Sequence, residues 1–156
     1  MGHIKVLTEQ VASQIAAGEV IERPASIVRE LLDNSIDAGS TRITIRIEAG
    51  GRHLIRIGDN GAGMGRDDLC LCITRHATSK IQEISDLSSI RTLGFRGEAL
   101  ASIAAVSRLE MTSRPADQLI GHRLKVIGGQ FMRLEETGAP PGTLVDVQDL
   151  FFNLPA

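Results

Sequence analysis

One segment of the chain concentrates acidic and amide side chains that could bind a metal ion and activate water. Between Pro24 and Ala38 the residues Glu30, Asn34 and Asp37 recur at positions i, i+4 and i+7, so a helix would place them on one face. Such oxygens suit a hydrated Mg²⁺, and a nearby carboxylate could act as a general base. The alternative is a solvated polar face, although such faces usually carry basic residues at i+4 and this one carries none.

A short glycine-rich turn could bind a flat ligand. The segment Asp59-Asn60-Gly61-Ala62-Gly63 follows a predicted strand. It could be a simple turn, in which Asp59 binds its own backbone. The second glycine favours a binding site, because a residue without a side chain lets a flat ligand approach the backbone closely. The Asp59 carboxylate could then accept a hydrogen bond from an exocyclic amine.

The stretch Gly94-Phe95-Arg96-Gly97 could bind phosphate groups. It precedes a predicted helix, Glu98–Val106, and the start of a helix presents free N–H groups and the positive end of the helix dipole. An ordinary entry into a helix is the alternative. No Gly-Lys-Ser/Thr follows, which excludes a Walker A loop, and no strand leads directly into it, which excludes a dinucleotide fingerprint. Thr78, Ser79 and Lys80 would add two hydroxyls and a cation beside a phosphate.

Helices and strands must bring these candidate residues together. Helical spacing of apolar residues, with glycine or proline at the ends, predicts helices over the ranges Thr8–Gly18, Pro24–Gly39, Asp67–Arg75 and Glu98–Val106. The apolar face of the second helix is expected to comprise Val28, Leu31, Leu32 and Ile36. Alternating apolar residues predict strands over the ranges Thr41–Glu48, His53–Ile57, Arg108–Ser113, Ile120–Ile127, Gln130–Glu135 and Thr143–Val147. With hairpin turns at 49–51 and 128–129, we expect an α+β sandwich with a mainly antiparallel sheet.

Length and composition fit one globular domain of a cytoplasmic protein. The 156 residues are 42% hydrophobic and 23% charged, enough for one core without disulfides or metals. The net charge of −2 gives no general attraction to nucleic acid or anionic membranes. Cys70 and Cys72 lie two positions apart in a predicted helix, so they are expected to be core residues instead of metal ligands. The longest apolar stretch, Ala99–Val106, is too short to span a bilayer.

The order of the motifs resembles the GHKL superfamily of ATPases, which includes type II topoisomerase subunits, heat-shock chaperones and sensor kinases. The shared pattern comprises Glu30-x-x-x-Asn34, Asp59-x-Gly61-x-Gly63, the Gly94–Gly97 stretch and Gly142-Thr143. Longer segments resemble the mismatch-repair branch of that superfamily, the MutL family, and its bacterial members in particular. These segments are Gln14–Val20, Glu22–Ser26, Asp37–Gly39, Arg75–Lys80 and Gly94–Ile103. The resemblance runs from about Ile4 to the last residue.

The resemblance implies a Bergerat fold, in which ATP lies between helices on one face and a mixed, mostly antiparallel sheet. It implies that Glu30 is the general base, that Asn34 holds Mg²⁺ and that Asp59 binds the adenine amine. The other residues implied in nucleotide binding are Ala38, Gly61, Gly63, Met64, Thr78, Ser79, Lys80, Leu93, Gly94, Phe95, Arg96, Gly97, Leu100 and Thr143. Thr143 would support Asp59, and the segments Thr78–Lys80 and Leu93–Gly97 would cover the phosphates.

The same resemblance implies a slow Mg²⁺-dependent ATPase whose cycle switches conformation and dimerisation in DNA mismatch repair. The implied partners are a MutS-like mismatch-recognition protein, downstream repair factors, a second copy of the chain and weakly bound DNA, with no membrane. Residues 1–156 would be the N-terminal lobe of a longer protein that has a second lobe and a dimerisation region. The alternative is a non-catalytic module in which ATP only orders the segment Ala77–Gly97. Glu30 favours the enzyme, and a sensor kinase is disfavoured because Gly94–Ile103 is unlike a kinase lid.

Overall fold

The computed structural model describes residues 23–73 and 95–154, with the backbone alone for residues 95–98. The predicted helix over Thr8–Gly18 therefore lies outside the described residues. So do five predicted phosphate-binding residues, Thr78, Ser79, Lys80, Leu93 and Gly94. No helix in the described ranges is long and apolar enough to cross a membrane.

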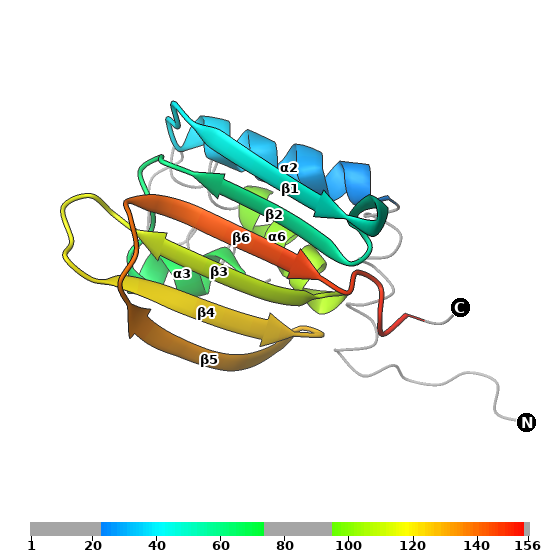
Figure 1. The fold of residues 1–156 in the computed structure, drawn as a ribbon. Helices are drawn as coiled ribbons and strands as arrows, with labels where there is room; N and C mark the ends of the chain where they lie inside the picture. The colour runs from blue at the N-terminus through cyan, green and yellow to red at the C-terminus, as the bar shows by residue number, and fades with distance from the viewer. Residues whose placement is uncertain (1–22, 74–94, 155–156) are drawn as a thin grey trace, which may run out of the picture.

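In the described ranges six antiparallel strands form one sheet, and the described helices cover one of its faces (Figure 1). The strands are β1 Ile43–Glu48, β2 Leu54–Asp59, β3 Arg108–Arg114, β4 Gly121–Ile127, β5 Gln130–Thr137 and β6 Gly142–Gln148. Their order is β1-β2-β6-β3-β4-β5, so the last strand is inserted between β2 and β3. Every pair of neighbours is antiparallel. The predicted α/β sandwich is confirmed, and each strand matches its predicted range to within two residues at either end.

Both predicted hairpin turns form where glycine permits left-handed backbone angles. Between β1 and β2 the short 3₁₀ turn Ala49–Gly51 holds Gly50 at a φ of 65°. Gly128 and Gly129, at φ values of 57° and 82°, connect β4 to β5. Glycine adopts these angles without the steric cost that a Cβ would impose.

Helix α2, Pro24–Asp37, supplies the polar face predicted from the sequence. It begins at its proline and ends before Gly39, which has a φ of 76°. Its buried residues are Ile27, Leu31 and Ser35, which form an i, i+4, i+8 stripe packed over β2. The prediction for Ile36 is wrong, because its side chain is 63% exposed. The buried stripe includes a serine instead, since its hydroxyl is hydrogen-bonded inside the protein.

The two other described helices differ from prediction at their ends. Helix α3, Arg66–Cys72, stops before the predicted end at Arg75. Helix α6, Phe95–Ala105, begins three residues before the predicted start at Glu98. Phe95, Arg96 and Gly97 therefore belong to this helix, and the prediction that they precede it is wrong. A glycine costs about 1 kcal/mol inside a helix, which the good helix formers after Gly97 can outweigh.

The core lies between the helices and the sheet. Two rows of side chains from β2, β6, β3 and β4 face the helices: Ile57, Val145, Met111 and Leu124 form one, and Ile55, Val147, Leu109 and Val126 the other. Leu31 of α2, Leu69 of α3 and Ile103 of α6 pack against them. On the edge strand β1 the corresponding Ile45 and Ile47 are half exposed, because α2 packs over β2 instead of over β1.

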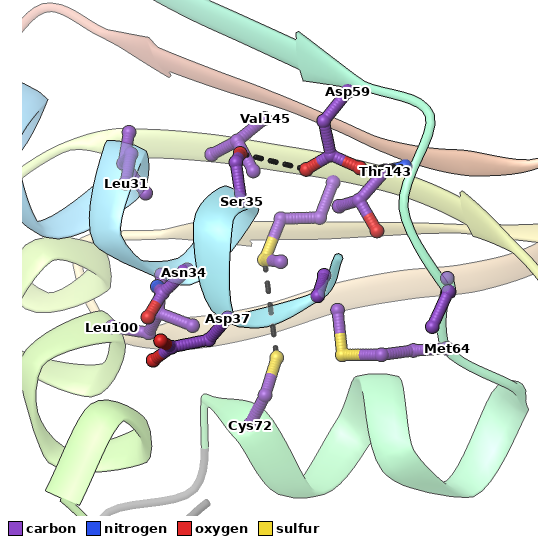
Figure 2. Close-up of a pocket in the computed structure, with 14 residues that line it drawn as sticks. Leu31, Asn34, Ser35, Asp37, Asp59, Met64, Cys72, Leu100, Thr143 and Val145 are labelled. Carbon is purple, nitrogen blue, oxygen red and sulfur yellow. Dashed lines mark hydrogen bonds between the residues drawn. The ribbon is translucent and has the colours of Figure 1, made fainter. Parts of the chain in front are cut away.

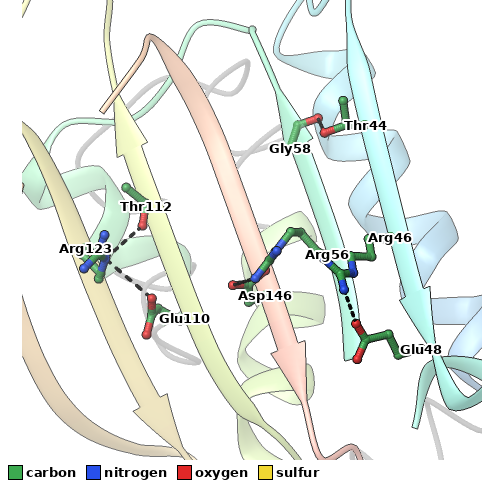
Figure 3. A network of polar contacts seen from close by, with 9 residues as sticks. All are labelled: Thr44, Arg46, Glu48, Arg56, Gly58, Glu110, Thr112, Arg123 and Asp146. Atoms are coloured by element: carbon green, nitrogen blue, oxygen red, sulfur yellow. Dashed lines mark hydrogen bonds and ion pairs between the residues drawn. The ribbon is translucent and has the colours of Figure 1, made fainter. Parts of the chain in front are cut away.

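The opposite face of the sheet carries charged side chains in register (Figure 3). Asp146 on β6 is largely buried and accepts two hydrogen bonds from Arg56 on β2, with N···O distances of 2.6 and 3.2 Å. The hydrogen bond to this carboxylate raises the pKa of Arg56. Further along, Arg123 Nε lies 3.5 Å from a Glu110 oxygen. Side chains on this face pair neighbouring strands, whereas the motif residues that line a cavity in the described part of the chain lie on the helical side.

Candidate active site

A cavity of about 230 Å³ lies between α2, α3, α6 and one end of the sheet (Figure 2). Its walls bring together residues from six separate segments of the chain. They are Leu31, Asn34, Ser35, Asp37, Ala38, Asp59, Ala62, Gly63, Met64, Cys72, Leu100, Met111, Thr143 and Val145. The residues among them that the sequence predicted are Asn34, Ala38, Asp59, Gly63, Met64, Leu100 and Thr143. Motifs separated by more than a hundred residues therefore share one cavity.

Three hydrogen bonds fix the Asp59 carboxylate in the wall of this cavity. Its Oδ2 accepts a hydrogen bond from the Ser35 hydroxyl at 2.7 Å. Its Oδ1 accepts from the backbone N–H of Gly61 at 2.9 Å and of Thr143 at 3.3 Å. The turn interpretation of this motif is thus correct, and the carboxylate also lines the cavity. A carboxylate offers about four acceptor positions, so three donors fix its orientation and leave capacity for a ligand.

The glycines near Asp59 shape the turn more than they widen the cavity. A Cβ on Gly63, whose φ is +72°, would lie 2.2 Å from the carbonyl oxygen of Arg114. A Cβ on Gly61 would lie 2.7 Å from the Cβ of Ala38 and 2.8 Å from its carbonyl oxygen. Gly61 therefore packs against the end of α2, outside the cavity wall. Both positions require glycine for close packing of the backbone.

The polar face of α2 forms at the spacing predicted from the sequence. Asn34 and Asp37 lie on the cavity wall, where Figure 2 shows their side chains side by side. Glu30 lies one turn earlier and is half-buried, beyond the wall of this cavity. Among the described residues no three His, Cys, Asp or Glu side chains come together as a metal site. The amide oxygen of Asn34 is nevertheless a hard donor suited to Mg²⁺, provided that water and phosphate oxygens complete the coordination.

Sequence reasoning missed two serines, Ser35 in the cavity wall and Ser113 behind it. Ser35 is 3% exposed and holds Asp59. Ser113 on β3 is fully buried, accepts a hydrogen bond from Met64 N–H at 2.7 Å and lies 2.7 Å from the Thr143 hydroxyl. The signal for Ser35 was its i+4 spacing from Leu31. Nothing local indicated Ser113, because its partners are distant in the sequence.

Sulfur atoms form part of the apolar wall. Cys72 Sγ donates to the carbonyl oxygen of Leu69 at 3.0 Å and lies 4.0 Å from the Met111 sulfur. Figure 2 shows the Met64 side chain extending into the same region. Burial raises the pKa of the Cys72 thiol to about 12, so it is a neutral wall residue at physiological pH. The prediction that Cys72 is a core residue agrees with this burial.

Comparison with known proteins identifies the family of this chain. A family model described as histidine kinase-, DNA gyrase B-, and HSP90-like ATPase matches residues 22–128. Over its full length the chain is 59% identical to the DNA mismatch repair protein MutL of Acidobacterium capsulatum and 58% identical to that of Heliobacterium modesticaldum. It spans 24% of the length of each of these curated relatives.

Solved structures give the same result. The MutL ATPase domain of Aquifex aeolicus complexed with ADP has 34% identity and a TM-score of 0.66, covering 86% of this chain and 45% of that one. The N-terminal domain of a DNA repair protein has 33% identity and a TM-score of 0.78. The match covers 96% of this chain and 44% of that one. The chain therefore belongs to the family of histidine kinase-, DNA gyrase B- and HSP90-like ATPases, within which it is similar to the ATPase domain of MutL mismatch-repair proteins.

Proposed function

We propose that this chain binds ATP in the cavity beside Asp59 and hydrolyses it slowly, as the N-terminal ATPase lobe of a longer, cytoplasmic mismatch-repair protein. The observation that carries the proposal is the Asp59 carboxylate, which three donors from α2, its own turn and β6 hold in the cavity wall. The ADP complex of the similar Aquifex aeolicus domain supports the same ligand class.

We assign a chemical role to each residue of the proposed site. Asp59 accepts a hydrogen bond from the adenine amine, while Met64, Leu100 and the Ala38 end of α2 surround the base with apolar surface. Asn34 holds Mg²⁺, which supplies charge neutralisation on the phosphate oxygens when it is bound. Glu30, one helical turn from Asn34, takes the proton from the attacking water. The phosphates are assigned to Thr78, Ser79, Lys80 and the segment Leu93–Gly97.

The similarity to MutL proteins supports a role in mismatch repair within a longer protein. We assign to nucleotide turnover a change of conformation and of dimerisation between two copies, with a MutS-like protein, downstream repair factors and weakly bound DNA as partners. The alternative is a module that binds ATP or ADP without turnover in this chain. The two differ in whether phosphate is released.

Glu30→Ala tests the assignment of the base. A positioned base contributes about 10²–10⁴-fold in rate, so phosphate release should fall by that factor while ATP affinity, measured by calorimetry, stays within about twofold. Asp67→Ala, at an acidic side chain that is 92% exposed on α3, is the matched control and should change neither quantity.

Three outcomes decide between the proposals. Release at the parental rate by Glu30→Ala would show that another group is the base. Binding by the parent protein without any phosphate release would establish the non-catalytic module for this chain. Absence of ADP and ATP binding by the parent protein would overturn the proposed function itself.

A further inference from the structure

A buried serine connects three segments that surround the base-binding end of the cavity. Ser113 lies on β3 directly opposite Thr143 on β6, and Thr143 in turn lies opposite Asp59 on β2. The Ser113 oxygen is within hydrogen-bond distance of three groups: Met64 N–H at 2.7 Å, the Gly142 carbonyl at 3.1 Å and the Thr143 hydroxyl at 2.7 Å. Its side chain is fully buried, so no solvent can replace any of these partners.

Counting protons fixes the direction of these hydrogen bonds. A serine hydroxyl has one proton and two lone pairs. Met64 N–H can only donate and the Gly142 carbonyl can only accept. If Ser113 donates to Gly142, then Thr143 donates to Ser113 and all three contacts are hydrogen bonds. If Ser113 donates to Thr143 instead, only two of the three are made. The first arrangement is favoured, because buried polar groups are almost always paired.

In the favoured arrangement the Thr143 hydroxyl donates its proton to Ser113. Its oxygen can therefore only accept a hydrogen bond from a ligand in the cavity. Thr143 lines the cavity beside Asp59, and an ionised carboxylate also can only accept. We propose that Ser113 is a positioning residue that makes the Thr143 hydroxyl an acceptor, so that this end of the cavity selects an amine over a carbonyl on the bound base. The inference rests on the proposed nucleotide binding and extends it to a residue outside the cavity wall.

The direct test compares ADP with inosine diphosphate, which carries a carbonyl where adenine carries its amine. The quantity is the ratio of the two dissociation constants, inosine diphosphate over ADP, measured by calorimetry. Thr143→Val removes the hydroxyl and preserves the shape of the side chain. If the Thr143 hydroxyl accepts a hydrogen bond from the amine of the base, the variant loses affinity for ADP alone and the ratio falls about tenfold. If the hydroxyl donates, the variant loses affinity for inosine diphosphate and the ratio rises, which would overturn the proposal.

Ser113→Ala then tests whether Ser113 is the cause of this selectivity. Without Ser113 the Thr143 proton is free to point into the cavity, so the ratio should again fall severalfold. A purely structural role would weaken both nucleotides equally and leave the ratio unchanged. Ser107→Ala is the matched control: Ser107 is equally buried and donates to Ile103 at 2.7 Å, away from the cavity. It should leave the ratio at the parental value.

A double-mutant comparison isolates the coupling. In a Thr143→Val background, Ser113→Ala should not change the ratio further, because the group through which it acts is gone. An additional change in that background would overturn the proposal. If Ser113→Ala fails to fold, as judged by thermal unfolding, Ser113→Cys replaces it with a side chain of similar size and weaker hydrogen bonds. A parent protein that binds ADP and discriminates, with a ratio insensitive to Ser113, refutes this inference and leaves the proposed function intact.

Discussion

At the scale of the residue, the protein itself fixes the orientation of Asp59 in the cavity wall. Its carboxylate is held by a side chain of α2 and by two backbone N–H groups. Reorienting it would break several charge-assisted hydrogen bonds, each stronger than an ordinary one. The carboxylate therefore presents its remaining acceptor capacity in a fixed direction.

Asp59→Asn should abolish nucleotide binding. The amide has one acceptor oxygen where the carboxylate has two, so the donors of Ser35, Gly61 and Thr143 compete for it. The new NH₂ group also meets the amine of the base. We expect a loss of ADP affinity of at least about a hundredfold, worth roughly 3 kcal/mol, measured by calorimetry. Asp67→Asn, at an exposed position of α3, is the control, and retention of affinity by Asp59→Asn would contradict the adenine assignment.

The two cysteines should differ in reactivity although they lie two residues apart. Only the thiolate reacts, and burial raises the pKa of Cys72 to about 12. Cys70 is half-buried. Mass spectrometry after alkylation of the folded protein at about pH 8 should find Cys70 modified and Cys72 unmodified. In denaturant both should react, and equal labelling in the folded protein would contradict the burial of Cys72.

At the scale of the element, local sequence patterns predicted most of the described helices, strands and turns. Helix α2 and the two glycine hairpins could be read from spacing and turn residues alone, since these depend on neighbours in the sequence. The error at Ile36 and the omission of Ser35 share one cause, because the buried stripe of α2 includes a polar residue whose partner lies on β2. Likewise, the role of Ser113 depends on strands that are distant in the sequence.

Gly142 gives the sharpest test of how an element sets the site. Its φ is +118°, and an added Cβ would lie 2.0 Å from the carbonyl oxygen of Asp59. Gly142→Ala should therefore push β6 away from Asp59, lowering stability by roughly 1–3 kcal/mol and weakening ADP binding. Gly138→Ala in the preceding turn is the control, because nothing lies within 4 Å of its added Cβ. Thermal unfolding and calorimetry compare the two, and equal stability would contradict the close packing.

At the scale of the whole molecule, strand order was beyond sequence reasoning. The strands themselves were predicted, but the insertion of β6 between β2 and β3 depends on pairings far apart along the chain. The periodicity of apolar residues indicates which face of a strand is buried, but it does not indicate which strands lie beside it in the sheet. The order of the motifs along the chain indicated the resemblance to a known family, which no single motif did.

Nucleotide binding should raise the unfolding temperature of the protein. A ligand that binds only the folded state stabilises it by about 2.7 kcal/mol at a hundred times its dissociation constant. The midpoint should therefore keep rising with ADP concentration, and inosine diphosphate at equal concentration should raise it less. Circular dichroism is the suitable probe, because the chain has no Trp or Tyr. A midpoint independent of ADP would contradict binding to the folded state.

The central position of β6 has a consequence for how the protein emerges from the ribosome. Until Gly142–Gln148 has been synthesised, β2 and β3 have no shared neighbour, and the nascent chain holds two separate pieces of sheet. The Thr143 contacts to Asp59 and Ser113 are also made by these late residues. A translating chain therefore gains its central strand and the proposed binding site in the same step, so an incomplete product should not retain nucleotide through these contacts.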